Sequence, residues 1–236
     1  MKRATLEALT AARAEGRAIV RATDLETGED TLIDPARDAS ALGAAAAIAA
    51  RADQSGNVEI DGRNWFLSVF NPPLDLVLVG AAHIAQPLSQ MAQMAGYGVR
   101  IIDPRTAFAT EDRFPGMAIS HAWPDEALAK APLGFRSALV VLAHDPKIDD
   151  PGLVAALNSS CFYVGALGSR KSHAARLMRL KKAGLSDAQT ARIKGPVGLD
   201  IGAKSPAEIA VSILAEITLA LRGSRGETAA AARTNS

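Results

Sequence analysis

The stretch that decides the fold is "LDLVLVGAAHIAQPLSQMAQMAGYGVRIID", which runs from Leu74 to Asp103. It reads as an apolar strand, a turn of small residues, a helix and a second strand, which is the order of a nucleotide-binding βαβ unit. A phosphate-binding turn of this type needs one glycine for the tight bend and a second for close approach of the ligand. Gly80 meets the first need, but Ala82 stands in the second position. We expect the methyl group of Ala82 to weaken close approach of an ordinary dinucleotide.

The rest of this unit keeps the features of an anion site. Ala85 supplies the third small residue, and a helix that begins near His83 offers free N–H groups at the positive end of its dipole. Asp103 follows the second strand at close to the usual spacing for a carboxylate that binds a ribose. From this unit alone, a Rossmann-like core without a working cofactor site stays an alternative.

Short continuous apolar runs predict the rest of the sheet, because parallel strands covered by helices on both faces have no polar side. The predicted strands are residues 75–80, 98–103, 117–120, 137–144 and 161–168. Helices or loops separate them, which predicts an α/β fold with a Rossmann-like, doubly wound, mostly parallel sheet. This domain is expected to cover residues 74–222, and the tail 223–236 has too little to bury and is expected to be disordered.

Residues 1–70 predict a small α+β module of a different kind. A helix over residues 3–15 precedes a hairpin that turns at Thr27-Gly28, and a second hairpin turns at Asp61-Gly62. Between the hairpins, Ser40 is the expected N-cap of another helix. The run Asn71-Pro72-Pro73 excludes helix and removes backbone donors, so it marks the domain boundary.

Composition limits the function classes. The chain has 26 basic and 25 acidic residues, a net charge of +1 that argues against nucleic-acid binding as its main purpose. Its single cysteine, Cys161, excludes an internal disulfide and a thiolate zinc cluster, which favours an intracellular location. The sequence contains neither a signal-length apolar stretch nor the roughly 18 apolar residues of a membrane span. We therefore expect a cytoplasmic protein.

Polar residues follow two further predicted strands, and ligands of open parallel sheets bind beyond the carboxyl ends of the strands. His144 and Asp145 follow one strand. Gly165, Gly168 and Ser169 end another, and a basic helix then begins at Arg170. Glycines permit close backbone approach, and a hydroxyl and a guanidinium suit phosphate. Each feature alone has a plain structural explanation, a strand cap or a solvated turn, but together with His83 they favour one convergent site.

The last informative stretch is "GPVGLDIGAKSPAEIAVSILAEI". Ser205 and Glu208 form a capping box, and Pro206 suits the first position of the apolar helix that follows. The glycine-rich segment before it is predicted to be a loop near the same sheet edge. Asp200 and Lys204 are candidates for ligand contacts there, and a loop that only braces the final helix is an equal alternative.

Three stretches taken in order, "VGAAHIAQPLSQMAQMAGYGVRIIDPR", "AHDPKIDDPGLVAALNSSCFYVGALGSRK" and "GLDIGAKSPAEIAVSILAEI", resemble the Rossmann domain of the XdhC/CoxI family. The resemblance covers Leu74 to Leu221. It implies a maturation factor for molybdenum hydroxylases such as xanthine dehydrogenase and carbon monoxide dehydrogenase. Such a factor binds the molybdenum cofactor, as molybdopterin or its dinucleotide form, assists its sulfuration by a cysteine desulfurase, and passes it to the apoenzyme. The resemblance therefore implies a cofactor-binding chaperone more than a catalyst.

The family's motifs map onto individual residues. Its Gly-x-Gly-His turn appears as Gly80-Ala81-Ala82-His83, its Asp-x-Arg as Asp103-Pro104-Arg105, and its His-Asp as His144-Asp145. The chain departs from the family at Ala82 and in lacking the Ser-x-Pro motif of the N-terminal domain, so cofactor handling is either incomplete or shared with a partner. We expect the phosphate end at Gly80–His83 and Gly168–Arg170. The predicted cofactor-binding residues are Gly80, Ala81, Ala82, His83, Asp103, Arg105, His144, Asp145, Gly165, Gly168, Ser169, Arg170 and Asp200.

Other readings stay open at this point. An NAD(P)-dependent oxidoreductase would use His144 as its acid or base, and a scaffold that has lost its ligand would still bind the apoenzyme or the desulfurase. Cys161 is the only thiolate available to molybdenum, although a small buried residue is the ordinary finding in an apolar strand. Strand edges of the N-terminal module favour a homodimer. The client enzyme and the nucleotide form of the cofactor are not indicated.

Overall fold

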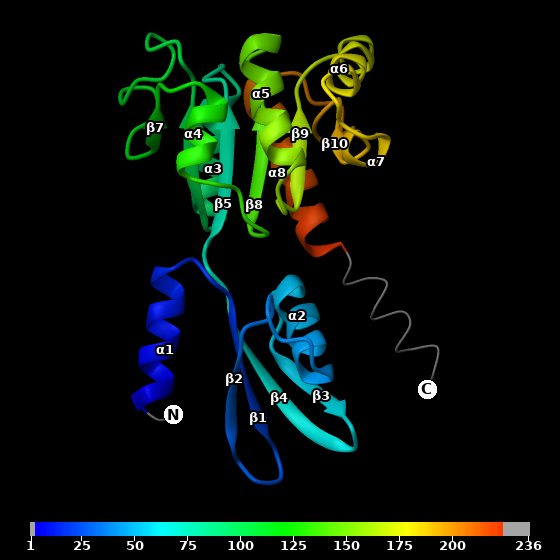
Figure 1. Cartoon of the computed structure of the whole chain (residues 1–236). Helices are drawn as coiled ribbons and strands as arrows, with labels where there is room; N and C mark the ends of the chain where they lie inside the picture. The colour runs from blue at the N-terminus through cyan, green and yellow to red at the C-terminus, as the bar shows by residue number, and fades with distance from the viewer. Residues whose placement is uncertain (1–2, 224–236) are drawn as a thin grey trace. The chain divides into compact units, whose positions relative to one another are not determined.

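The computed structural model describes residues 3–223, which divide into two compact units between Pro73 and Leu74 (Figure 1). The predicted disordered tail lies outside the described residues, apart from Gly223. No helix in the described part of the chain is long and apolar enough to cross a membrane.

The first unit is a four-stranded antiparallel sheet in the order β2-β1-β4-β3. Its elements are α1 (Arg3–Ala14), β1 (Ile19–Asp24), β2 (Asp30–Ile33), α2 (Ala41–Ala52), β3 (Gly56–Ile60) and β4 (Arg63–Phe70). Both predicted hairpins are confirmed, because β1 pairs with β2 and β3 with β4. Asp61 and Gly62 have φ of 52° and 75°, as the tight turn between β3 and β4 requires. Ser40 caps α2 by accepting from the N–H of Gly43.

The second unit is built on a six-stranded sheet in the order β10-β9-β8-β5-β6-β7, and every strand pair is parallel. Its strands are β5 (Leu74–Val79), β6 (Tyr97–Ile102), β7 (Ala118–Ser120), β8 (Ser137–Val141), β9 (Tyr163–Ala166) and β10 (Ile193–Lys194). The five predicted strands are confirmed, with β8 and β9 shorter than expected. The sequence reasoning missed β10, because two residues carry no readable apolar period.

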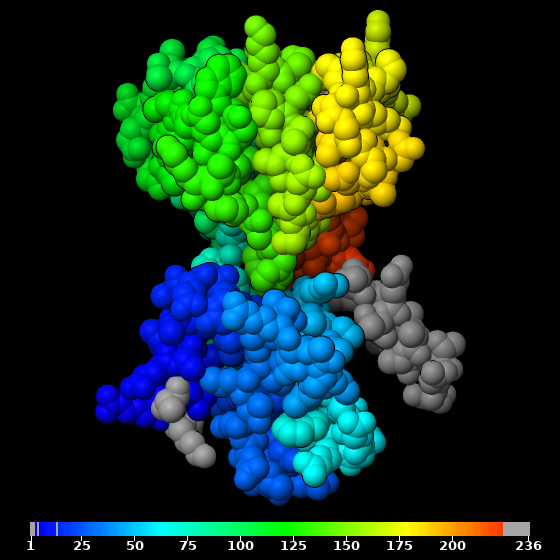
Figure 2. All heavy atoms as spheres, viewed as in Figure 1, coloured from blue at the N-terminus to red at the C-terminus, as the bar shows by residue number. Residues whose placement is uncertain are grey.

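Helices cover both faces of this sheet, as a doubly wound fold requires (Figure 1). Figure 2 shows the surface of the face that α4, α5 and α6 cover. The helices are α3 (Ala85–Met94), α4 (Pro124–Lys130), α5 (Pro146–Leu157), α6 (Arg170–Lys182), α7 (Asp187–Thr190) and α8 (Pro206–Arg222). One core lies between the sheet and α3 with α8, and includes Leu76, Leu78 and Ile213. The other lies beneath α4, α5 and α6, and includes Val77, Val79 and Leu153. Successive residues of β5 thus point into different cores, which is why its apolar run is continuous.

The strand order places the start of this unit in the middle of the sheet. From β5 the chain moves to β6 and β7 on one side, and then to β8, β9 and β10 on the other. The order therefore reverses between β5 and β8. In open parallel sheets the ligand crevice lies beyond the carboxyl ends of the strands at this reversal, so the turns after β5 and β8 are the first place to look for a site.

Candidate functional site

The turns after β5 and β8 touch directly through Gly80. Gly80 has a φ of 98°, and its N–H donates to the carbonyl of Ile102 at 2.8 Å. A Cβ on Gly80 would lie 2.6 Å from the backbone nitrogen of Ala143 and 2.8 Å from its Cα. Glycine is therefore needed here both for the backbone conformation and for the contact between two backbones. The predicted role of Gly80 in a tight turn matches this geometry.

The remainder of the β5–α3 turn presents a helix N-terminus. Ala81 is fully buried, Ala82 is half-buried against the core on the α3–α8 side, and His83 is exposed. The helix begins at Ala85, two residues later than predicted, and its N-cap residue Ile84 makes no side-chain capping hydrogen bond. Amide groups at such an end retain hydrogen-bonding capacity and a positive partial charge, which suits an anion.

Asp103, which follows β6, holds this turn in place through hydrogen bonds of its carboxylate. Its Oδ2 accepts from the N–H of Ala81 at 2.8 Å, and its Oδ1 accepts from the N–H of Arg105 at 2.9 Å. The Arg105 guanidinium adds two bonds, Nε to Oδ1 at 2.9 Å and Nη2 to Oδ2 at 2.8 Å. Burial alone would raise the pKa of Asp103, but the bonds from Arg105 and Ala81 outweigh it and hold that pKa below its ordinary value. Both carboxylate oxygens are thus engaged within the protein.

Arg105 is the most exposed part of this arrangement. Its side chain is 38% exposed and lies over the ring of Phe108, with 4.6 Å from Cζ to the ring centroid. The hydrogen bond to Asp103 raises the pKa of Arg105, and the charges of Asp103, Asp145 and Asp149 raise it further. Asp145 and Asp149 of the β8–α5 segment therefore lie within electrostatic reach of Arg105.

The β8–α5 turn carries the predicted His-Asp pair. His144 is exposed and adopts a left-handed backbone conformation with a φ of 61°, which is uncommon for a residue other than glycine. Asp145 is the N-cap of α5, and its Oδ1 accepts from the N–H of Lys147 at 3.0 Å. Asp145 therefore caps a helix and not a strand, and the imidazole of His144 lies on the surface of the turn without a part in this cap.

The β9–α6 turn contains the third group of predicted residues. Gly168 has a φ of 137°, and Ser169 caps α6 by accepting from the N–H of Ser172 at 3.1 Å. Arg170 is exposed at the start of that helix. Gly165 is different, because it lies inside β9 and a Cβ there would be 2.6 Å from Cγ2 of Val197 and 2.9 Å from the Tyr163 ring. The structure thus buries Gly165 beneath other side chains.

The loop that holds Asp200 passes the end of β9. The N–H of Val197 donates to Ala166 at 3.2 Å, and Glu208 and Ser205 form the predicted capping box of α8. The N–H of Gly198 donates to the carboxylate of Glu216 at 2.8 Å, which braces the loop against α8. Asp200 itself is exposed, and within residues 3–223 no hydrogen bond joins it to another predicted site residue.

Sequence reasoning missed two buried charged residues beneath these turns, Asp149 and Arg176. Asp149 is 2% exposed, and burial raises its pKa to about 6. Arg176 is 4% exposed and donates from Nη2 to the carbonyl of Leu167 at 2.8 Å. The one available signal was spacing, since Asp149 stands one helical turn after Asp145. Arg176 reads in sequence as one more cation of a solvated basic helix.

Cys161 lies away from the candidate site. It precedes β9, at the amino edge of the sheet, and is 3% exposed. Its thiol donates to the carbonyl of Ala156 at 3.3 Å, and burial raises its pKa, so the uncharged thiol is favoured. The ordinary reading of Cys161 as a buried core residue fits this position. Within the described residues, no group of three or more His, Cys, Asp or Glu side chains could hold a metal ion.

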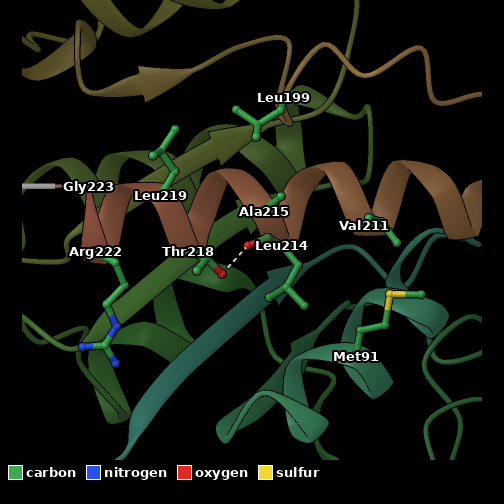
Figure 3. Close-up of a pocket in the computed structure, with 9 residues that line it drawn as sticks. All are labelled: Met91, Leu199, Val211, Leu214, Ala215, Thr218, Leu219, Arg222 and Gly223. Atoms are coloured by element: carbon green, nitrogen blue, oxygen red, sulfur yellow. Dashed lines mark hydrogen bonds between the residues drawn. The ribbon is translucent and has the colours of Figure 1, made fainter. Parts of the chain in front are cut away.

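A groove of about 670 Å³ runs along α8 and faces α3 (Figure 3). Its lining residues are Met91, Leu199, Val211, Leu214, Ala215, Thr218, Leu219, Arg222 and Gly223. The hydroxyl of Thr218 is satisfied by the carbonyl of Leu214 at 2.7 Å. Most of this lining is apolar, so the groove offers little for an anionic ligand. The polar groups that suit an anion lie at the carboxyl edge of the sheet.

Comparison with known proteins gives one family match. Residues 76–217 match the XdhC Rossmann domain. The chain is 32% identical over 154 residues to the Molybdenum cofactor insertion chaperone PaoD of Escherichia coli, which covers 65% of this chain and 42% of PaoD. It is 32% identical over 155 residues to a Bacillus subtilis protein named as a probable xanthine dehydrogenase subunit, which covers 65% of this chain and 45% of the relative.

A third relative is the Uncharacterized protein YqeB of Escherichia coli, which is 32% identical over 153 residues, 64% of this chain and 28% of its own length. The chain thus spans less than half the length of these curated relatives. Among solved structures, a xanthine dehydrogenase from Bacillus halodurans aligns with a TM-score of 0.70 and 20% identity, over 96% of this chain and 69% of that chain. At that identity the likeness supports the fold of both units alone.

Proposed function

The chain belongs to the XdhC Rossmann-domain family, and on that premise we propose that it is an accessory factor that binds the molybdenum cofactor and assists its insertion into a molybdenum hydroxylase. The names of two relatives, a molybdenum cofactor insertion chaperone and a probable component of a xanthine dehydrogenase, support this role. The observation that carries the proposal is the turn from Gly80 to His83. There Asp103 holds both the N–H of Ala81, in the turn that leads to the uncapped start of α3, and the guanidinium of Arg105.

The donor set of this edge fits the anionic end of the cofactor. A phosphate would be held by the amides at the start of α3, by Arg105, and by Arg170 beside the N-terminus of α6. The carboxyl ends of β5, β6 and β9 supply these groups, and the reversal between β5 and β8 lies among them. Ala82 does not contradict this fit, because it packs against the core.

We assign the polar contacts at the other end of the cofactor to His144 and Asp145. His144 is exposed on the β8–α5 turn, and Asp145 stands next to it within electrostatic reach of Arg105. The bound cofactor supplies the redox chemistry that the client hydroxylase uses. The residues of this chain hold and orient it. Within residues 3–223, no group of three or more His, Cys, Asp or Glu side chains could bind a metal ion.

The finer steps belong to the same proposal. A cysteine desulfurase would sulfurate the cofactor while it is held, the apo hydroxylase would receive it, and the first unit would contribute to a homodimer through its strand edges. Gly165 and Asp200 support the turns around the ligand, the first through packing and the second as an exposed group of the neighbouring loop. An NAD(P) site gains no support, because the Asp103 oxygens that would bind a ribose already accept bonds from Ala81 and Arg105.

The experiment is an anaerobic purification from a host that makes the cofactor, followed by molybdenum analysis and by fluorescence of the oxidised pterin. We expect molybdenum and pterin in near-equal amounts. NAD(H) in place of pterin would overturn the proposal in favour of an oxidoreductase. Protein that carries neither ligand but still binds an apo hydroxylase would overturn cofactor binding and leave a scaffold.

A further inference from the structure

Two ion pairs connect α5 to α6, and they differ sharply in their surroundings. Asp150 and Arg179 pair on the surface, with Nε to Oδ2 at 2.8 Å and Nη2 to Oδ1 at 3.0 Å. Asp149 and Arg176 face each other in the interior, with 4.0 Å between Nη2 and Oδ2 and side chains only 3% and 5% exposed. A buried ion pair of this kind costs desolvation free energy and is a poor source of stability. Its presence requires another explanation.

The Asp149 end of the buried pair holds the β8–α5 turn. Its Oδ1 accepts from the N–H of Ala143 at 3.1 Å, and the carboxylate lies near enough to the N–H of His144 for that amide to lower the pKa of Asp149. The bond to Ala143 and the nearby amide of His144 hold the turn in which His144 has its left-handed conformation, which a residue with a side chain adopts only when its surroundings impose it. Ala143 is the residue against which Gly80 packs, so Asp149 supports the β5–α3 turn as well.

The Arg176 end holds the β9–α6 turn. Its Nη2 donates to the carbonyl of Leu167, and a Cβ on Gly168 would lie 3.8 Å from the same nitrogen. Its Nε and Nη1 are buried and have no hydrogen-bond partner within residues 3–223. Two buried donor atoms of Arg176 are therefore unsatisfied. Its hydrogen bond from Nη2 goes to the carbonyl of Leu167, in the β9–α6 turn.

We infer that Asp149 and Arg176 are positioning residues that couple the β8–α5 turn to the β9–α6 turn, so that the two halves of the anion site keep one mutual arrangement. The inference rests on the proposed function for what the turns bind. Neither side chain is placed to touch the ligand. Asp149 acts through the amides of Ala143 and His144, and Arg176 acts through the carbonyl of Leu167.

The test is hydrogen exchange of the full, ligand-free chain, read in residues 142–146 and 166–170. We expect Asp149→Asn to speed exchange about tenfold in both segments, although Asp149 bonds only to the first. Arg176→Met should do the same, and the double variant should add little to either single change. The matched controls are Asp150→Asn and Arg179→Met, which break the exposed pair between the same helices and should leave both segments within about twofold.

Exchange that rises only in the mutated residue's own turn, or additive effects in the double variant, would overturn the coupling. If Arg176→Met does not fold, Arg176→Lys is compared with Arg179→Lys under the same criterion. Affinity for anaerobically prepared molybdopterin is measured next, at a temperature where each variant is fully folded, and should fall about tenfold in each buried-pair variant. A wild-type chain that binds no molybdopterin refutes the proposed function, and the exchange data still decide the coupling.

Discussion

Asp103 and Arg105 form a bidentate ion pair at the end of β6, and the same carboxylate accepts a hydrogen bond from the N–H of Ala81 in the neighbouring turn. One buried acid thereby fixes both the turn that precedes α3 and a guanidinium at the carboxyl edge of the sheet. Bidentate pairs of this kind are geometrically specific. Damage to Asp103 should therefore affect stability and ligand binding together.

We expect Asp103→Asn to lower the free energy of unfolding by about 3 kcal/mol, because it leaves the Arg105 charge without its partner. Cofactor retention should fall with it. Urea unfolding and pterin content measure the two effects. Asp112→Asn, which changes an exposed carboxylate later in the same loop, is the control and should change stability by less than about 0.5 kcal/mol. Equal effects at the two positions would contradict the anchoring role of Asp103.

Gly80→Ala tests whether the turns after β5 and β8 must touch. The new Cβ would meet the Ala143 backbone at 2.6 Å, so we expect a loss above about 3 kcal/mol in urea unfolding. Gly96→Ala is the matched control, because Gly96 has a similar φ of 86° but nothing within 4 Å of an added Cβ. It should cost only about 1–2 kcal/mol of backbone strain. If both changes cost the same, the backbone contact is unimportant.

Ala82→Gly addresses the departure from the family's turn. Since Ala82 packs against the core, we expect the glycine to cost about 1 kcal/mol of stability and to leave molybdopterin affinity within about twofold. Calorimetric binding and urea unfolding check the two outcomes. A large gain in affinity would show that the methyl group faces the ligand.

Arg170→Ala should lower cofactor retention about tenfold, because it removes a charge-assisted bond to the phosphate end. Lys182→Ala is the control, an exposed cation at the other end of α6. Retention is read from pterin fluorescence after desalting. Unchanged retention in Arg170→Ala would remove that residue from the site, whereas equal losses would point to a general charge effect.

Asp149 should make stability depend on pH between about 4 and 6. Burial raises its folded-state pKa to about 6, above the roughly 3.9 of an unfolded aspartate. The folded state therefore favours the protonated acid. The stability of the wild-type fold is highest in this respect below pH 4, where Asp149 is protonated in both states, and it falls as the pH rises through 6 and the buried carboxyl must ionise. Asp149→Asn stays neutral, so its stability relative to wild type should improve by about 3 kcal/mol from pH 4 to pH 7. Parallel urea curves over this range test it, and a constant difference would contradict the raised pKa.

Much of the fold could be predicted because its signals are local. Ser40 and Ser205 each cap the start of a helix with their own side chain, which is a signal readable from the sequence. Asp61-Gly62 favours the backbone conformation of a tight hairpin turn. The start of α3 was misplaced by two residues, because Ile84 caps it with backbone alone and leaves no side-chain signal. The short strand β10 was missed for a similar reason.

Sequence alone determined the order of the strands apart from β10, the family that the second unit resembles, and which polar residues follow strand ends. These properties depend on neighbours along the chain, whose periodicity and motifs are readable in one dimension. Only the tertiary structure decided what those residues do. It turned Asp103 inward as an anchor, filled the space over Gly165 with Tyr163 and Val197, and buried Arg176 opposite Asp149. Burial and ion pairing are set by segments far apart in sequence, and only folding brings those segments together.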